Sequence, residues 1–226
     1  MKKKTFSVAI DGPAGAGKST LARAAAKELG FYYVDTGAIY RAVGYHMWMM
    51  GIGPKDADGI RRFLDDVNLS VEYDDDGIQH MILNGKDVTD EIRTPLMSSY
   101  ASGVSAQACV RDVLLDMHRE LARRHNVVMD GRDIATVVLP NADVKIFLTA
   151  SPEIRAKRRF AELQAKGEKT TLEKVLSDMK ARDKQDSTRT VAPLRCAPDA
   201  VKLDTSGMNL EEAKNAILEL VRRKLG

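Results

Sequence analysis

Residues 12–20 read Gly12-Pro13-Ala14-Gly15-Ala16-Gly17-Lys18-Ser19-Thr20. The apolar run before them, Phe6–Asp11, predicts a strand, and the residues after the last glycine predict a helix over Lys18–Leu29. The stretch fits the pattern Gly-x-x-x-x-Gly-Lys-Ser/Thr of a phosphate-binding P-loop, in the strand-loop-helix context that this pattern requires. It therefore predicts an α/β fold with a nucleoside triphosphate site at the end of its first strand.

The residue types of this loop suit a bound triphosphate. Glycines allow backbone N–H groups to turn inward around phosphate oxygens, and the helix N-terminus attracts anions. We expect all of residues 12–20 to contact ATP, with Lys18 reaching its β- and γ-phosphates and Ser19 ligating Mg²⁺. The alternative, a glycine-rich turn that only caps a helix, does not explain why Lys18 and Ser19 both follow it.

Apolar runs and helical patterns alternate along most of the chain, which predicts parallel strands joined by helices. The five expected strands are Phe6–Asp11, Phe31–Asp35, Val127–Asp130, Val144–Thr149 and Val201–Asp204. The expected helices are Lys18–Leu29, Ala38–Met50, Ile60–Val67, Ala106–Arg124, Pro152–Lys166, Leu172–Lys184 and Leu210–Leu225. The predicted fold class is α/β, a P-loop-type parallel five-stranded sheet flanked by helices.

One part of the chain breaks the alternation. Three short segments are separated by the turn signals Asp76-Gly77 and Asn84-Gly85, and they are Ser70–Tyr73, Gln79–Leu83 and Asp87–Val88. This spacing predicts a small antiparallel β insert. The acidic run at 74–76 is interpreted as a solvated hairpin turn.

Composition limits the remaining classes. The 226 residues are 44% hydrophobic and 30% charged, which suits a chain with a sizeable core and excludes a largely disordered one. Lys and Arg number 35 against 32 Asp and Glu, so the net charge of +3 gives no reason to expect a nucleic-acid or membrane partner. Cys109 and Cys196 lie far apart, without disulfide-like or zinc-like spacing, and a cytoplasmic location is expected.

Two segments at strand ends indicate a second, anionic substrate. The first, Asp35–Arg41, puts Arg41 one turn into a helix at the edge of the sheet where α/β folds bind ligands. In the second, Asp130–Asp133, Asp130 ends an apolar strand, where P-loop enzymes place a carboxylate that coordinates magnesium, usually through water. Arg41 and Arg132 could together clamp a phosphate. The alternatives are a surface salt bridge for Arg41 and a plain turn for Asp130–Asp133.

The P-loop alone does not separate kinases from switches, motors and transporters. The guanine-reading segment Asn-Lys-x-Asp of GTPases is missing from the sequence, as is the Leu-Ser-Gly-Gly signature of ABC-type ATPases. Both of these classes are therefore disfavoured.

In their order and spacing these motifs resemble the nucleoside monophosphate kinases and, more narrowly, the bacterial cytidylate kinases. The resemblance extends over residues 6–204 and is carried by Ile10–Pro13, Asp35–Arg41, Asp90-Glu91-Ile92-Arg93-Thr94, Asp130–Asp133 and Val191-Ala192-Pro193-Leu194. The β insert falls where this family carries one in its monophosphate-binding domain. The resemblance implies in-line transfer of the γ-phosphoryl group of MgATP to CMP or dCMP, giving CDP or dCDP and ADP.

The resemblance also implies roles for single residues. Asp133 would accept a hydrogen bond from N4 of cytosine, while Arg111 and Ser102 would donate to N3 and O2. The other residues expected to bind CMP are Thr36, at a position where the family often has serine, Arg41, Arg132 and Arg189 at the phosphate, and Arg182 and Asp186 at the ribose. For Ser102 a bond to a helix carbonyl is the alternative, and for Arg111 a surface ion pair with Asp112.

Residues 155–189 are dense in Lys and Arg, and the resemblance identifies them as a short helical lid. We expect Arg158 and Arg182 of this lid to act with Lys18 and Arg132 in catalysis, because closure brings arginines to the transferred group and excludes water. The alternative to a lid is a pair of solvated helices in this segment. The expected organisation is a single unit and a monomer, with core residues 1–68, 93–154 and 190–226, an insert at 69–92 and a lid at 155–189.

No histidine is expected to be catalytic, because His46, His80, His118 and His125 show no spacing with a second ligand or base. The nearest rival function is a kinase of the same fold acting on UMP or shikimate. A rival of another class is a nucleotide-dependent switch that hydrolyses ATP slowly.

Overall fold

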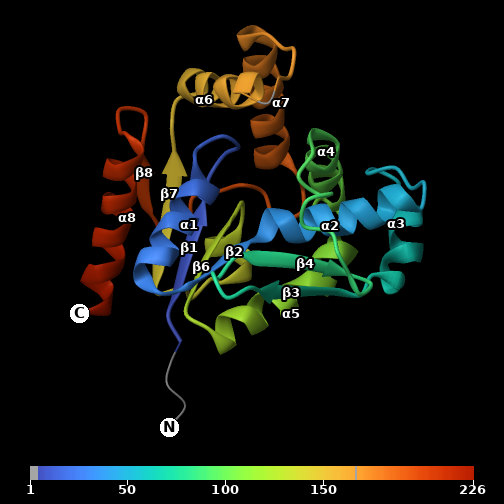
Figure 1. The fold of residues 1–226 in the computed structure, drawn as a ribbon, viewed down its shortest axis with the longest axis horizontal. Coiled ribbons are helices and arrows are strands. Elements are labelled where there is room, and N and C mark those ends of the chain that lie inside the picture. The colour runs from blue at the N-terminus through green and yellow to red at the C-terminus, as the bar shows by residue number, and fades with distance from the viewer. Residues whose placement is uncertain (1–4, 166) are drawn as a thin grey trace.

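The computed structural model describes residues 5–165 and 167–226, so residues 1–4 and the predicted helix end at Lys166 lie outside the described part. Parallel strands form a central sheet in the order β2-β6-β1-β7-β8 (Figure 1). They are β1 (Ser7–Asp11), β2 (Tyr32–Asp35), β6 (Val127–Gly131), β7 (Val144–Thr149) and β8 (Val201–Asp204). The predicted five-stranded parallel sheet is confirmed.

Helices cover both faces of this sheet, because successive strand residues point to opposite sides. Val8 and Ile10 of β1 belong to one buried cluster, which includes α1 (Lys18–Leu29) and α8 (Leu210–Leu225). Ala9, between them, belongs to the other cluster, with residues of the helices on the opposite face. Those helices are α2 (Thr36–Met49), α4 (Pro95–Val104) and α5 (Ala108–Arg124).

The predicted antiparallel insert is confirmed as a second sheet in the order β3-β4-β5. Its strands are β3 (Leu69–Tyr73), β4 (Gln79–Leu83) and β5 (Lys86–Asp87), preceded by α3 (Ala57–Phe63) and a 3₁₀-helix η1 (Leu64–Asp66). Asp74–Asp76 are exposed in the turn between β3 and β4, as predicted. The buried side chains of Met81 and Leu83 join the larger core cluster, so the insert packs on α2.

Helices α6 (Pro152–Ala165) and α7 (Leu172–Thr188) stand above the sheet, at the edge where the parallel strands end (Figure 1). They pack on each other through a small hydrophobic cluster of their own, formed by Ala156, Leu163, Val175 and Met179. This helix pair therefore has a hydrophobic cluster separate from the two clusters on the faces of the sheet.

The sequence patterns missed two elements. Helix α4 begins after Thr94, whose Oγ1 accepts a hydrogen bond from Met97 N at 3.2 Å, and Pro95 opens its first turn. A π-helix, η2 (Ile134–Val138), follows β6 because two N–H groups donate to the Asp133 carbonyl. The predicted helix 60–67 is also wrong in its bounds, since the α-helix there spans 57–63 and only the 3₁₀-helix follows.

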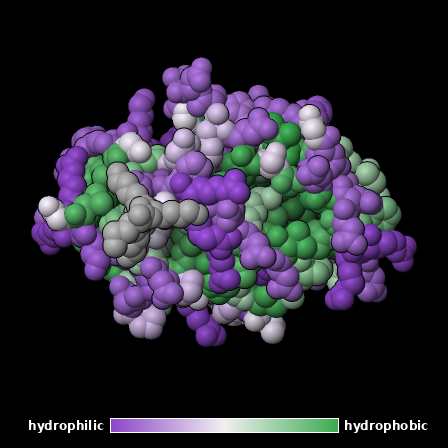
Figure 2. Space-filling model, turned by 90° about the horizontal axis from the view of Figure 1, so that it is seen from below, coloured by the Kyte–Doolittle hydropathy of each residue, from purple (hydrophilic) through white to green (hydrophobic). Residues whose placement is uncertain are grey.

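Charged and polar residues cover most of the face in Figure 2, and hydrophobic residues gather on the side of the small sheet. The charged residues counted in the sequence are thus largely a solvated surface. Among the helices of the described residues, we find none that combines the length and the apolar character needed to cross a membrane.

Candidate active site at the end of the parallel sheet

Residues 12–17 connect β1 to α1 in a conformation that requires glycine. At Gly12 the φ angle is 151°, and a Cβ atom there would lie 2.0 Å from the Leu148 carbonyl oxygen of β7. Gly17, the residue before α1, is left-handed with a φ of 85°. These glycines let the chain turn back over the sheet and open α1 with free N–H groups.

Lys18 lies inside this loop, and its Nζ donates a hydrogen bond to the Pro13 carbonyl at 2.8 Å. Burial, followed by the charge of Arg132, lowers the pKa of the Lys18 ammonium to about 7. A cation that is costly in the free protein is stabilised by an arriving anion, which is the behaviour expected of a phosphate-binding lysine.

Asp130, at the end of β6, is held at both carboxylate oxygens. The Ser19 hydroxyl donates to Oδ2 at 3.0 Å, and the Tyr33 hydroxyl donates to Oδ1 at 2.8 Å. Burial and the neighbouring Asp35 raise the pKa of Asp130. The predicted metal-binding pair, Ser19 and Asp130, is thus brought together, whereas no sequence signal singled out Tyr33.

The end of β2 carries the next group. Asp35 caps α2 by accepting from Ala38 N at 2.9 Å, and it pairs with Arg41 at 3.0 Å. Both side chains are about one-fifth exposed, with values of 19% and 21%, so the surface salt bridge weighed above is a half-buried pair at the site. The Thr36 hydroxyl donates to the Asp130 carbonyl at 2.7 Å and so ties α2 to β6.

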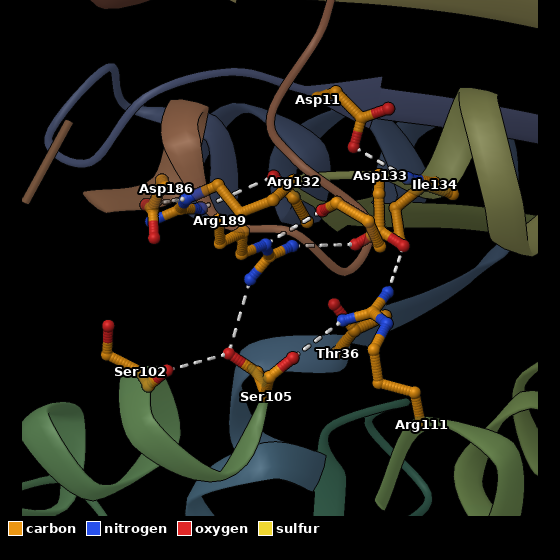
Figure 3. A network of polar contacts seen from close by, with 12 residues as sticks. Asp11, Thr36, Ser102, Ser105, Arg111, Arg132, Asp133, Ile134, Asp186 and Arg189 are labelled. Atoms are coloured by element: carbon orange, nitrogen blue, oxygen red, sulfur yellow. Dashed lines mark hydrogen bonds and ion pairs between the residues drawn. The ribbon is translucent and has the colours of Figure 1, made fainter. Parts of the chain in front are cut away.

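A buried polar network lies beside these residues (Figure 3). The Arg111 guanidinium pairs with Asp133 and donates to the Ser105 carbonyl at 3.2 Å. Arg189 reaches the second oxygen of Asp133 at 3.4 Å and the Ser105 hydroxyl at 3.3 Å. Since Arg111 is buried and faces Asp133, the alternative surface pair with Asp112 is wrong.

Asp11 helps to position this network. Asp11 accepts from Ile134 N at 2.8 Å and from Ala135 N at 2.7 Å, which fixes the turn that carries Asp133. Burial raises the pKa of Asp11 to about 6 despite these bonds.

The Oγ of Ser102, on α4, is buried without a hydrogen-bond partner among the described residues, so the alternative bond to a helix carbonyl is not made.

The third group lies on α7. Asp186 pairs with Arg132 at 2.8 Å. Arg182 is half-buried, and its pKa is lowered to about 10 by burial first and then by the charge of Arg132, with smaller effects from Arg41 and Arg159, while Asp186 opposes the shift. The Nε of Arg182 has no hydrogen-bond partner in the described part of the chain. Arg182 therefore lies near several other arginines and one carboxylate at this edge of the sheet.

Neighbouring arginines on α6 contact different groups. Arg158 donates to the Thr205 carbonyl at 2.8 Å, beyond β8, whereas Arg159 is the one whose charge acts on Arg182. A second residue with no assigned role, Arg155, donates to the Ala14 carbonyl of the P-loop at 3.0 Å and pairs with Asp183 of α7 at 2.8 Å. The dense basic run was a signal for such contacts but did not identify the residues that make them.

Among the described residues, the histidines make none of these polar contacts, although His118 lies near Arg111 and its ring centre is 6.0 Å from that of Tyr40. His46 and His118 are each 1% exposed, whereas His80 pairs with Asp87 at the insert and His125 contacts the ring of Tyr32. Among the described residues, no group of three or more His, Cys, Asp and Glu side chains could hold a metal ion by itself.

Burial of His118 predicts acid sensitivity. Its pKa is lowered to about 4, so between pH 6.5 and 4 the unfolded chain binds a proton here that the folded chain does not. We expect stability to fall as the pH drops through this window, with a loss of about 2 kcal/mol at pH 5. Urea unfolding at pH 7.5 and 5 should show that His118→Leu removes this loss.

His80→Gln is the control for that measurement. Bonds to Asp87 and Asp74 raise the pKa of His80, so its contribution to stability changes with pH in the opposite direction. An acid sensitivity of His118→Leu equal to that of the unmodified protein would contradict the assignment.

A P-loop facing a cluster of arginines and a buried polar network defines the class of this protein, a P-loop kinase. A sequence model of the family described as Cytidylate kinase matches residues 8–223. The chain is 48% identical over 217 residues to proteins named Cytidylate kinase from Caldicellulosiruptor bescii and Carboxydothermus hydrogenoformans, covering 96% of this chain and 96% and 97% of theirs. The chain therefore belongs to the cytidylate kinase family.

A solved structure gives an independent comparison of the fold. An uncharacterized protein from Eubacterium ventriosum is 13% identical, with a TM-score of 0.53 over 98% of this chain and 99% of that one. At this identity the likeness concerns the fold alone.

Proposed function

We propose that this protein transfers the γ-phosphoryl group of ATP to CMP or dCMP, giving ADP and CDP or dCDP. Membership of the cytidylate kinase family supports the proposal. The observation that carries it is the group of arginines at the end of the sheet, where Arg41 and Arg132 are each held by a carboxylate and the Nε of Arg182 is buried without a hydrogen-bond partner among the described residues. A buried guanidinium N–H is costly unless a ligand completes its hydrogen bond, and a nucleoside monophosphate brings nearly two negative charges at neutral pH.

In this proposal Arg41, Arg132 and Arg189 hold the acceptor phosphate, and Arg182 and Asp186 contact the ribose. The half-buried Asp35–Arg41 pair and the Asp186–Arg132 pair support it, because each arginine is already aimed at the site by a carboxylate. The Thr36 hydroxyl, which donates to the Asp130 carbonyl, would hold the start of α2 next to β6.

The base site would use Ser102, Arg111 and Asp133. The buried and unpartnered Ser102 Oγ supports this assignment, since an isolated hydroxyl in a folded protein is costly unless a ligand completes its hydrogen bonds. Cytosine offers N4 as a donor to the Asp133 carboxylate, whereas uracil would turn an oxygen toward it. We therefore expect CMP to be preferred over UMP.

ATP would bind residues 12–20. The donor set there fits Mg²⁺, which prefers oxygen ligands, takes one or two carboxylates together with substrate phosphates and keeps several waters. The Ser19 hydroxyl and the Asp130 carboxylate lie 3.0 Å apart beside the loop, and Asp130 would act through water. When bound, Mg²⁺ neutralises charge on the phosphates and helps to orient them.

The transfer would be direct and in line. The acceptor oxygen is largely ionised at neutral pH, so no general base is required and catalysis rests on positioning and charge stabilisation. Lys18, Arg132 and Arg182 would stabilise the charge of the transferred group. Arg158 is held by Thr205, so we assign the further lid cation to Arg159 in its place.

Residues 155–189 would act as the lid and residues 69–92 as part of the monophosphate-binding region. The separate hydrophobic cluster of α6 and α7 supports a unit that moves as one body. We also propose a cytoplasmic monomer without a nucleic-acid partner, which the two free thiols and the nearly balanced charge support.

The proposal is tested by ADP release from MgATP in a coupled assay, with CMP, dCMP, UMP, AMP and shikimate as acceptors and a blank without acceptor. We expect turnover with CMP and dCMP that is at least about tenfold above the others, because the base site discriminates by hydrogen bonding. Preference for UMP or shikimate would point to the rival kinases. Equal rates in every tube, the blank included, would favour a nucleotide-dependent switch.

A further inference from the structure

The carboxylate of Asp130 is fixed by two hydroxyl groups from different elements. Ser19 of α1 holds Oδ2 and Tyr33 of β2 holds Oδ1, at 3.0 and 2.8 Å. Asp130 is 4% exposed and Tyr33 is 5% exposed, so the contact between these two residues is shielded from bulk water, whereas Ser19 is exposed. The carboxylate is therefore unable to turn about its Cβ–Cγ bond without breaking a buried hydrogen bond.

Tyr33 is itself held in place. The guanidinium of Arg23, on α1, lies 5.3 Å from the centre of its ring. In the sheet register Tyr33 pairs with Val128, two residues before Asp130, so the long phenol reaches the end of the neighbouring strand. The ring contact and the hydrogen bond to Asp130 together hold the phenol in this orientation.

We propose that Tyr33 is a positioning residue for phosphoryl transfer, which orients the Asp130 carboxylate toward the magnesium ion of MgATP. The inference rests on the proposed function for its reaction. By holding Oδ1, the phenol keeps Oδ2 beside Ser19 and the P-loop, where the ion and its water shell would lie. Hydrogen-bonded partners of metal-binding groups commonly contribute 10- to 100-fold to metal affinity or activity.

The competing explanation is that Tyr33 only fills space between β2 and α1. Tyr33→Phe keeps the ring beneath Arg23 and removes only the hydroxyl. Tyr73→Phe is the matched control, since it also removes one half-buried phenol near β2, but that phenol donates to the main-chain carbonyl of Tyr33 and not to Asp130. A packing role predicts similar behaviour of the two variants.

The first measurement is Mn²⁺ binding to the complex of each protein with ADP, followed by electron paramagnetic resonance. We expect Tyr33→Phe to weaken Mn²⁺ about tenfold, with ADP binding in the absence of metal unchanged, and Tyr73→Phe to bind Mn²⁺ like the unmodified protein. The Mg²⁺ concentration for half-maximal turnover should rise about tenfold in Tyr33→Phe, with the KM for CMP unchanged. Equal Mn²⁺ affinity in all three proteins would overturn the proposal.

A double-mutant cycle gives a second test. If Tyr33 acts through Asp130, then in an Asp130→Asn background the change Tyr33→Phe should have no further effect on Mn²⁺ affinity. A full effect in that background would also overturn the proposal. Turnover of the unmodified protein with CMP tests the proposed function separately, because Mn²⁺ binding to the ADP complex does not depend on the acceptor.

Discussion

Lys18→Ala is expected to reduce phosphoryl transfer to CMP by about a thousandfold or more. Cations placed on the phosphates of the transferring group contribute factors of this size in P-loop enzymes. Lys18 is the cation inside the loop, and its Nζ now rests on the Pro13 carbonyl, within the span of residues that would surround the β- and γ-phosphates. Lys18→Ala removes a positive charge that stabilises the phosphates of the bound triphosphate.

The same change should leave the folded protein stable. Burial lowers the pKa of Lys18 to about 7, which means that its positive charge is costly in the free protein. Thermal unfolding of the free Lys18→Ala variant should therefore stay within a few degrees of the original, while the stabilisation that added ADP gives to the unmodified protein is lost.

Lys27→Ala is the matched control, because Lys27 is exposed on the same helix and the same side-chain atoms are removed. It should retain turnover and the ADP-induced stabilisation. Near-normal rates in Lys18→Ala would show that residues 12–20 are not the phosphate site.

The sequence patterns predicted the fold well where the signal is local. The strands of the parallel sheet lie where apolar runs predict them, and the insert carries its own turn residues. Helix α4 was missed because serine and glycine, which form helices poorly, occupy much of it, although Thr94 and Pro95 are a start signal. The π-helix η2 depends on bonds to the carbonyls of Asp133 and Ile134, for which no sequence pattern exists.

The site was predicted only where motifs name its residues. Pairs that the fold creates were invisible, because their members are distant in sequence. Tyr33 and Asp130 are 97 residues apart, and Arg155 and Ala14 are 141 apart. A run of basic residues likewise does not reveal which group each of its members contacts, as for Arg158 with Thr205 and Arg159 with Glu162.

Asp133→Asn is expected to reduce the preference for CMP over UMP by about 100-fold, measured as the ratio of kcat/KM values. A carboxylate only accepts hydrogen bonds, so it suits the N4 amine of cytosine and opposes O4 of uracil. An asparagine amide can accept from N4 of cytosine or donate to O4 of uracil. The loss for CMP and the gain for UMP therefore add in the ratio.

The ratio also separates base reading from a structural role. Asp133 is the common partner of the buried Arg111 and of Arg189, so Asp133→Asn should cost about 3 kcal/mol of stability as well. Lost stability lowers the rates with both acceptors by the same factor and leaves the ratio unchanged. Asp112→Asn, an exposed change next to Arg111, should alter neither quantity. An unchanged ratio with reduced stability would make Asp133 a structural counter-charge, and the base would then have to be read by Ser102 and Arg111 alone.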